Sequence, residues 1–174
     1  MDKRHLLRSA RHESGHVVLA LFFGGTFENV EIALDDNPLP ISGTAADTCT
    51  LSQEVGGAVR ELYVDDDHAN IITLMGGAAG TKVNRKKPGA FTFFDMLTGC
   101  EGDYRAAKAE VTPRHIQCFA RKAKTLDGYL NECHVLAHQI IVKYKDVHTA
   151  LVDALMKKGS LTYNECKRVW NERD

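Results

Sequence analysis

The chain has 174 residues, of which 44% are hydrophobic and 26% charged, and its formal net charge is −1. These values suit one soluble domain with a real core, and the lack of long basic or acidic blocks argues against nucleic acid or an anionic membrane as a partner. The longest apolar run, Val17 to Phe23, is far shorter than the roughly 20 residues of a membrane span, and no signal-peptide pattern accompanies it. We therefore expect a cytoplasmic protein without a membrane span.

The cysteines favour the same compartment. There are five of them, an odd number, and no two form a C-x-x-C pair. This pattern predicts reduced, mostly buried thiols and argues against a structural zinc site built from cysteines. The cysteines are Cys49, Cys100, Cys118, Cys133 and Cys166.

The first predicted element is a long helix from Asp2 to Phe23, which the pair Gly24-Gly25 ends. It contains His12-Glu13-Ser14-Gly15-His16, which fits the pattern H-E-x-x-H. On a helix both histidines lie on one face and can reach one metal ion, while the glutamate points to the same place without being a ligand. The glutamate can then accept a proton from a metal-bound water, whose pKa zinc lowers to about 7. The competing interpretation is an amphipathic helix that carries two histidines by chance.

A small sheet is expected after this helix. Phe27 to Leu34 alternates in part between apolar and polar residues and predicts a strand, and after turn residues 35 to 40 the small, Thr-rich Ile41 to Thr50 suits a returning strand. The edge of such a hairpin can hold an extended peptide through main-chain hydrogen bonds. An ordinary sheet that covers the core explains the same pattern equally well.

The next predicted helix runs from about His68 to Ala79, with one residue of Asp65-Asp66-Asp67 as its cap and His68 at the surface. Its glycine-rich end superficially resembles a phosphate loop. The spacing G-x-x-x-x-G-K-[ST] is not met and no strand leads into it, so we expect no nucleotide site. Residues 82 to 94 are predicted to form a loop.

The remainder is predicted to be almost wholly helical. Thr98-Gly99-Cys100-Glu101 is a capping box, so a helix should begin there and carry Asp103 in its first turns. Thr112 and Pro113 begin another helix, breaks are expected near residues 127–128 and 144–146, and Thr162 with Glu165 caps the last helix. The predicted fold class is mainly α with a small β-hairpin or sheet (α+β). We expect a single domain, with residues 1–112 as the metal-site core and 113–174 as a C-terminal helical part.

A hydrolytic zinc site normally has three protein ligands and one open position for water, so the histidine pair needs a third ligand. No further histidine occurs before His68. Carboxylates on the later helix are better candidates: Asp103 and Glu101 both qualify, although a capping role explains Glu101 better, and Asp95 is less favoured.

A second histidine pair could bind a metal and one cysteine could line the site, but a structural role is favoured for each. His134 and His138 share the spacing of the first pair, but Val135 follows the first histidine, so no base is built in and a helical pair without metal is favoured. Cys100 is close to Asp103 in the sequence, and packing in the core is favoured over a place in the lining of the site.

Taken in order, these motifs resemble the peptidase domain of the FtsH-type, AAA-associated zinc metalloproteases over nearly the whole chain. His-Glu-Ser-Gly-His is similar to that family's H-E-A-G-H, and Ser42-Gly43-Thr44 to its G-G-T. Gly76-Gly77-Ala78-Ala79 is similar to G-G-R-A-A-E, Thr98 to Asp103 to T-G-A-x-x-D, and the tail from Leu130 to Trp170 to the closing helical hairpin.

The resemblance implies a zincin-like fold in which His12, His16 and Asp103 are the ligands of Zn2+ and Glu13 is the catalytic base. The sequence departs from the family at Ala78 and Gly80, where the family has arginine and glutamate. The stretch between Gly80 and Thr98 is long, which raises the question of whether it gates the site. The family's ATPase module and membrane anchor are expected to be absent.

The expected function is therefore that of a zinc-dependent metalloendopeptidase that hydrolyses peptide bonds in extended or unfolded polypeptides. The alternative is a peptidase-like peptide-binding or regulatory module, which needs a separate ATPase or unfoldase as partner or is catalytically silent. A purely structural zinc domain is least favoured, because such sites are usually closed by four cysteine-rich ligands. The sequence leaves the substrate and the formation of a homo-oligomer open.

Overall fold

The computed structural model describes residues 3–33, 57–87, 89–92, 95, 99–120 and 124–172. Most of these residues are helical, and a small antiparallel sheet of three strands accompanies the helices, which confirms the predicted fold class. The expected returning strand, Ile41 to Thr50, lies outside the described residues. Within the part of the chain that the structure describes, no helix is both long and apolar enough to cross a membrane.

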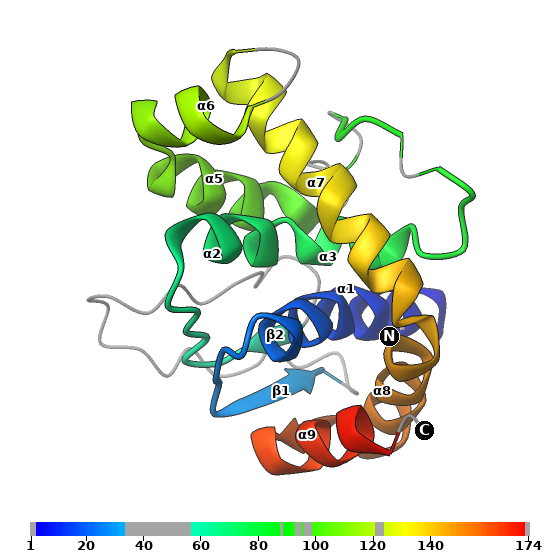
Figure 1. The fold of residues 1–174 in the computed structure, drawn as a ribbon. Helices are drawn as coiled ribbons and strands as arrows, with labels where there is room; N and C mark the ends of the chain where they lie inside the picture. Colours follow the sequence, from blue (N-terminus) through cyan, green and yellow to red (C-terminus); the bar gives the residue numbers. More distant parts are fainter. Residues whose placement is uncertain are drawn as a thin grey trace.

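Helix α1 (Lys3–Phe22) occupies the centre of the molecule, as Figure 1 shows, and contacts helices on one side and the sheet on the other. Nearly every side chain from Ser9 to Ala20 is buried, including both histidines and the glutamate of the H-E-x-x-H pattern. The helix ends as predicted at Gly24, which has a φ of 73° and lets the amide of Gly25 bond back to the carbonyl of Ala20 at 2.8 Å.

The sheet joins strands from distant parts of the chain in the order β2-β1-β3. Strand β1 (Asn29–Ile32) falls within the predicted strand, and it pairs with β2 (Gly57–Val59) and with β3 (Ser160–Thr162). Residues 160–162 were expected only to lead into the last helix. Their pairing with β1 brings the C-terminal region against the sheet beside α1.

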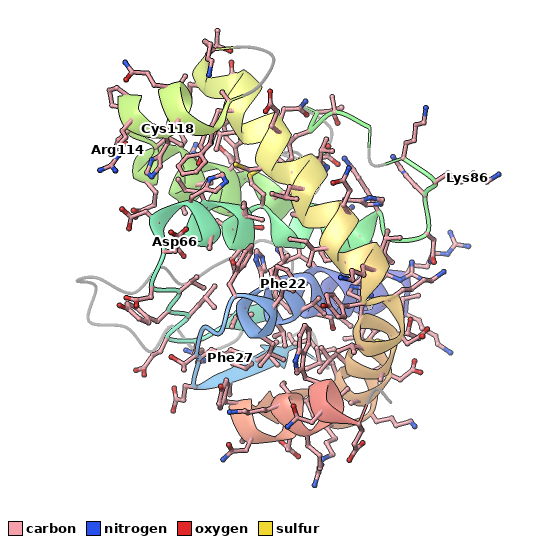
Figure 2. The ribbon with its side chains drawn as sticks, viewed as in Figure 1. Phe22, Phe27, Asp66, Lys86, Arg114 and Cys118 are labelled. Carbon is pink, nitrogen blue, oxygen red and sulfur yellow. The ribbon has the colours of Figure 1, made fainter. Side chains whose placement is uncertain are left out.

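The other helices follow the predicted order, except that the single helix expected from about His68 to Ala79 is two helices separated at Met75. They are α2 (Asp67–Leu74), α3 (Gly76–Thr81), α5 (Glu101–Glu110), α6 (Pro113–Phe119), α7 (Leu126–Lys143), α8 (Lys145–Lys158) and α9 (Tyr163–Asn171). The carboxylate of Asp66, labelled in Figure 2, caps α2 by accepting from the amide of Ala69 at 2.7 Å. Thr112 caps α6 and Thr162 with Glu165 forms a capping box at α9, as predicted; the return bond of His115 to Thr112, which completes a capping box at α6, was not predicted.

Two local expectations are corrected, and a third is tested only in part. The break expected near residues 127–128 lies earlier, because Thr125 caps α7 and those residues form its first turn. Helix α5 begins at Glu101 with Cys100 at the N-cap position. Thr98 of the expected capping box lies outside the described residues, and Glu101 pairs with Arg105 one turn later. His68 is half-buried and stacks on Phe119, so it is not a surface residue.

Helices α1 and α3 approach each other through glycines. A Cβ atom added to Gly15 would lie 2.3 Å from the carbonyl oxygen of Gly76 and 3.1 Å from the Cα atom of Gly80. No real side chain tolerates such distances, so α1 meets α3 backbone to backbone. This explains a glycine in the middle of a long helix, where it costs about 1 kcal/mol relative to alanine.

Gly15→Ala should therefore destabilise the protein by about 1–3 kcal/mol, because the clash with α3 outweighs the gain in helix propensity. Urea unfolding of the metal-free protein measures this change. Stabilisation of about 1 kcal/mol, as expected for a solvent-facing glycine in a helix, would show that the two helices are not in this contact.

Candidate metal centre

Two histidines of α1 and one aspartate of α5 direct their side chains at a common point. The Nε2 atoms of His12 and His16 are 3.2 Å apart, and Oδ2 of Asp103 lies 2.9 Å from the first and 3.3 Å from the second. The histidines are fully buried and Asp103 is 2% exposed. Helical spacing brings the imidazoles together, and the first turn of α5 supplies the carboxylate.

These separations match the ligand shell of a small divalent cation. Zinc bonds imidazole nitrogen and carboxylate oxygen at about 2.0–2.2 Å, and two such ligands at a tetrahedral angle stand about 3.3 Å apart. The three observed separations lie at or slightly below this value. The donor set, two nitrogens and one oxygen, also suits zinc, and three protein ligands leave a position for water.

The ring of His16 is oriented by a bond on its far side. Its Nδ1–H donates to the carbonyl oxygen of Thr73 in α2 at 2.7 Å. A neutral imidazole carries only one N–H, so in that form this bond leaves the lone pair of Nε2 available for a metal ion beside His12 and Asp103. On the corresponding side of His12, Nδ1 faces the sulfur of Cys100 at 3.8 Å.

The charges of the cluster reinforce one another. Burial lowers the pKa of His12, but the carboxylate of Asp103 outweighs it, so the pKa is raised well above its ordinary value. Burial raises the pKa of Asp103, but the positive charges of His12 and His16 draw it well below the ordinary value. A metal ion at this point has to displace a proton, so its affinity should fall as the pH falls.

Glu13 lies in the same buried region. A carboxylate oxygen of Glu13 and ring nitrogens of His12 and His16 lie within 4.8 Å of one another. Gly57, at the start of β2, packs against the glutamate: a Cβ atom there would be 2.7 Å from Cγ and Oε1 of Glu13. At this position of β2 the side chain of Glu13 packs directly against the backbone of Gly57.

The other carboxylates considered as third ligand lie elsewhere. Asp95 is buried in an ion pair with Lys82, whose Nζ is 2.7 Å from Oδ2, and it also accepts from Thr92. Glu101 pairs with Arg105 on the exposed side of α5. Only Asp103 among the three candidates is near the histidine pair.

The second histidine pair has no metal geometry. His138 donates from Nε2 to the carbonyl oxygen of Lys82 at 3.1 Å. Burial, together with the charge of Lys82, lowers the pKa of His134 to about 4, so it is a neutral core residue. In the described part of the chain, the groups that can hold a metal are His12 with Glu13 and His16, and His12 with Cys100 and Asp103.

Two contributors to the site were not found from the sequence. A Cβ atom on Gly77 of α3 would lie 2.3 Å from Nε2 of His12 and 2.6 Å from Nε2 of His16, so only glycine fits beside the imidazoles. Gly57 has the corresponding role beside Glu13. The signal in the sequence was the clustering of glycine and alanine at residues 76–80, which is unusual for a helix.

His148 of α8 supports α1 next to the site. Its Nε2–H donates to the carbonyl oxygen of Arg11 at 3.0 Å, immediately before His12. Burial lowers the pKa of His148 to about 4, so the ring is neutral near pH 7. Its role is structural.

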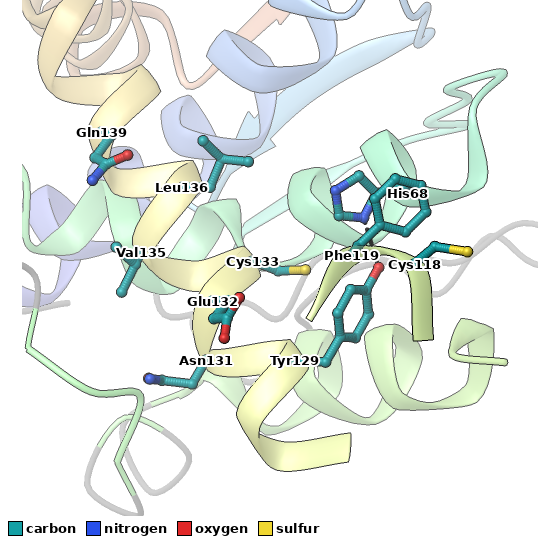
Figure 3. A pocket seen from close by; sticks show the side chains of 10 residues that line it. All are labelled: His68, Cys118, Phe119, Tyr129, Asn131, Glu132, Cys133, Val135, Leu136 and Gln139. Carbon is teal, nitrogen blue, oxygen red and sulfur yellow. Dashed lines mark hydrogen bonds between the residues drawn. The ribbon is translucent and has the colours of Figure 1, made fainter. Parts of the chain in front are cut away.

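A hollow of about 450 Å³ lies away from these residues, between α2, α6 and α7 (Figure 3). His68 and Tyr129 are joined there by a hydrogen bond of 2.7 Å, and His68 stacks on Phe119 with ring centroids 3.9 Å apart. None of the residues of the candidate metal centre lines this hollow.

Comparison with known proteins gives a distant similarity. The chain is 22% identical over 184 aligned positions to the ATP-dependent zinc metalloprotease FtsH 2 of Thermoanaerobacter sp. (strain X514). The alignment covers 95% of this chain and 33% of that protein, so the chain spans about a third of the relative's length. No protein-family model matches the chain. The similarity is to a zinc metalloprotease, which agrees with a metal-binding function.

Gly77→Ala should weaken zinc binding by at least tenfold, because the new methyl group would displace one or both imidazole nitrogens by a large fraction of an ångström. Competition with a chelating dye measures the affinity. Gly89→Ala is the control: its loop position has no atom within 4 Å of an added Cβ, although its φ of 69° carries some strain. Unchanged affinity in Gly77→Ala would contradict the close packing of α3 on the ligands.

Proposed function

We propose that this protein is a zinc-dependent metalloendopeptidase. The observation that carries the proposal is the meeting of Nε2 of His12, Nε2 of His16 and Oδ2 of Asp103 within 3.3 Å of one another, with Glu13 in the same buried region. Three ligands and an adjacent carboxylate are what zinc-assisted hydrolysis needs. The similarity to a protein named as a zinc metalloprotease supports the same reaction class.

Each residue then has a defined task. His12, His16 and Asp103 hold the ion, and the bond from His16 to Thr73 fixes which nitrogen faces it. Zinc, when bound, would polarise the scissile carbonyl and lower the pKa of water. Glu13 accepts a proton at its carboxylate and returns it to the leaving amine, and Gly57 keeps that carboxylate in place.

The substrate class follows from burial. The four side chains are at most 2% exposed, so a folded surface has no approach to them. An extended or unfolded polypeptide is the narrower substrate, and the buried site has to open before such a chain can enter. The proposed substrate is therefore an unfolded segment of another protein, delivered by a separate unfoldase where the target is folded.

The same burial favours one alternative function. A site that is closed in the resting protein suits a peptide-binding or regulatory module that is silent until an ATPase partner acts on it. This alternative retains the zinc ligands and differs from the first proposal in the absence of hydrolysis by the zinc-loaded protein alone.

Glu13→Gln should keep stoichiometric zinc and lower the rate of casein hydrolysis by at least 100-fold, because the amide cannot accept the proton. Released peptides and bound zinc are measured on the same samples. Glu101→Gln is the matched control, since this glutamate lies in the same region of sequence as Asp103 but pairs with Arg105 outside the cluster.

Full activity in Glu13→Gln would contradict the proposed role of the glutamate. A parent protein that binds zinc and yet leaves casein intact would favour the regulatory module. A parent protein that binds no zinc would contradict both functions.

A further inference from the structure

The two histidines of the metal centre have unlike partners behind their rings. His16 donates to a backbone carbonyl oxygen at 2.7 Å, which is a short and strong bond. His12 has the sulfur of Cys100 at 3.8 Å from Nδ1, within the reach of a hydrogen bond to sulfur. Cys100 is 1% exposed and stands at the N-cap position of α5, three residues before Asp103.

The sulfur contacts the far nitrogen of His12, and it also lies within 4.8 Å of a carboxylate oxygen of Asp103. It approaches Nδ1, whereas Asp103 and His16 both approach Nε2 of the same imidazole. The two nitrogens point away from each other, so a group bonded to one cannot also share a ligand position with the other. The geometry is that of a hydrogen-bond partner at Nδ1, the nitrogen that faces away from Asp103 and His16.

We propose that Cys100 is a positioning residue for the metal: its sulfur accepts the hydrogen bond from Nδ1–H of His12 and keeps Nε2 directed at the ion. This inference rests on the proposed zinc function. A neutral imidazole has one N–H, and a partner at Nδ1 selects the tautomer whose Nε2 lone pair is available. Carboxylates and carbonyl oxygens usually fill this position, and here a thiol does so.

The N-terminal end of α5 affects two of the proposed ligands, Asp103 and His12. The first turn of α5 presents Asp103 to the metal and Cys100 to the back of His12, so a shift of α5 would disturb both together. Because sulfur is a weak acceptor, His12 is held less firmly than His16. Packing alone, the role favoured for Cys100 from the sequence, would give it no effect on metal affinity.

The test compares zinc affinity in three variants by competition with a chelator near neutral pH. Cys100→Ala removes the acceptor and should raise the dissociation constant by about tenfold, the lower end of the range for such partners. Cys100→Ser keeps an acceptor on a shorter side chain and should lie between Cys100→Ala and the parent. Cys166→Ala removes a thiol that is equally buried, in α9, and should leave the affinity unchanged.

A zinc affinity in Cys100→Ala within twofold of the parent would overturn the inference while leaving the proposed function intact. If the parent itself bound no zinc, the proposed function would fail first. Should Cys100→Ala not fold, the comparison of Cys100→Ser with Cys166→Ala decides, since a pure packing role predicts equal affinities.

A second measurement needs no substitution. Cobalt replaces zinc in the parent protein and reports on its ligands through its absorption spectrum. We expect the bands of a site with nitrogen and oxygen ligands and no sulfur-to-cobalt charge-transfer band. Such a band would show that Cys100 binds the metal directly and would overturn its role behind the ring.

Discussion

Asp103 keeps a negative charge at a place where only 2% of its surface reaches solvent. Desolvating a carboxylate is expensive, and the cost is offset only because two imidazoles face the same oxygen at 2.9 and 3.3 Å. The imidazoles in turn come from the central helix, which is buried along the whole length that carries them. The arrangement of α1 against α5 therefore depends in part on these polar contacts.

The side chains of His12, His16 and Glu13 come together only because glycines, which have no side chain, stand at the points of closest contact. Gly15 lets α1 meet α3, Gly77 leaves room for both imidazoles, and Gly57 lets the sheet close on Glu13. Each of these glycines gives up helix or strand propensity for a close approach. Backbone atoms are thus in close contact with His12, His16 and Glu13, which limits the positions that these side chains can adopt.

Local signals in the sequence predicted much of this structure. The spacing of His12 and His16 on one helix face, the cap at Thr112 and the capping box at Thr162 involve residues within one turn of each other, and the structure contains them as expected. Among the carboxylates, the residues alone left Asp103 and Glu101 open, and the family resemblance pointed to Asp103. Only the fold places Glu101 and Asp95 in other ion pairs.

Contacts between distant segments were not predictable in the same way. Strand β3 exists because residues 160–162 pair with β1, about 130 residues earlier, and three residues carry no strand signal of their own. The positions of Gly57 and Gly77 against Glu13 and the histidines depend on how whole elements pack. The contact between Cys100 and His12 likewise depends on the packing of α5 near α1 and cannot be read from the sequence.

The most direct test of the metal centre is a crystal structure of the zinc-loaded protein, with an anomalous difference map recorded at the zinc edge. We expect one strong peak in contact with Nε2 of His12, Nε2 of His16 and a carboxylate oxygen of Asp103. A peak elsewhere, for instance between His134 and His138, or no peak at the histidine pair of α1, would contradict it.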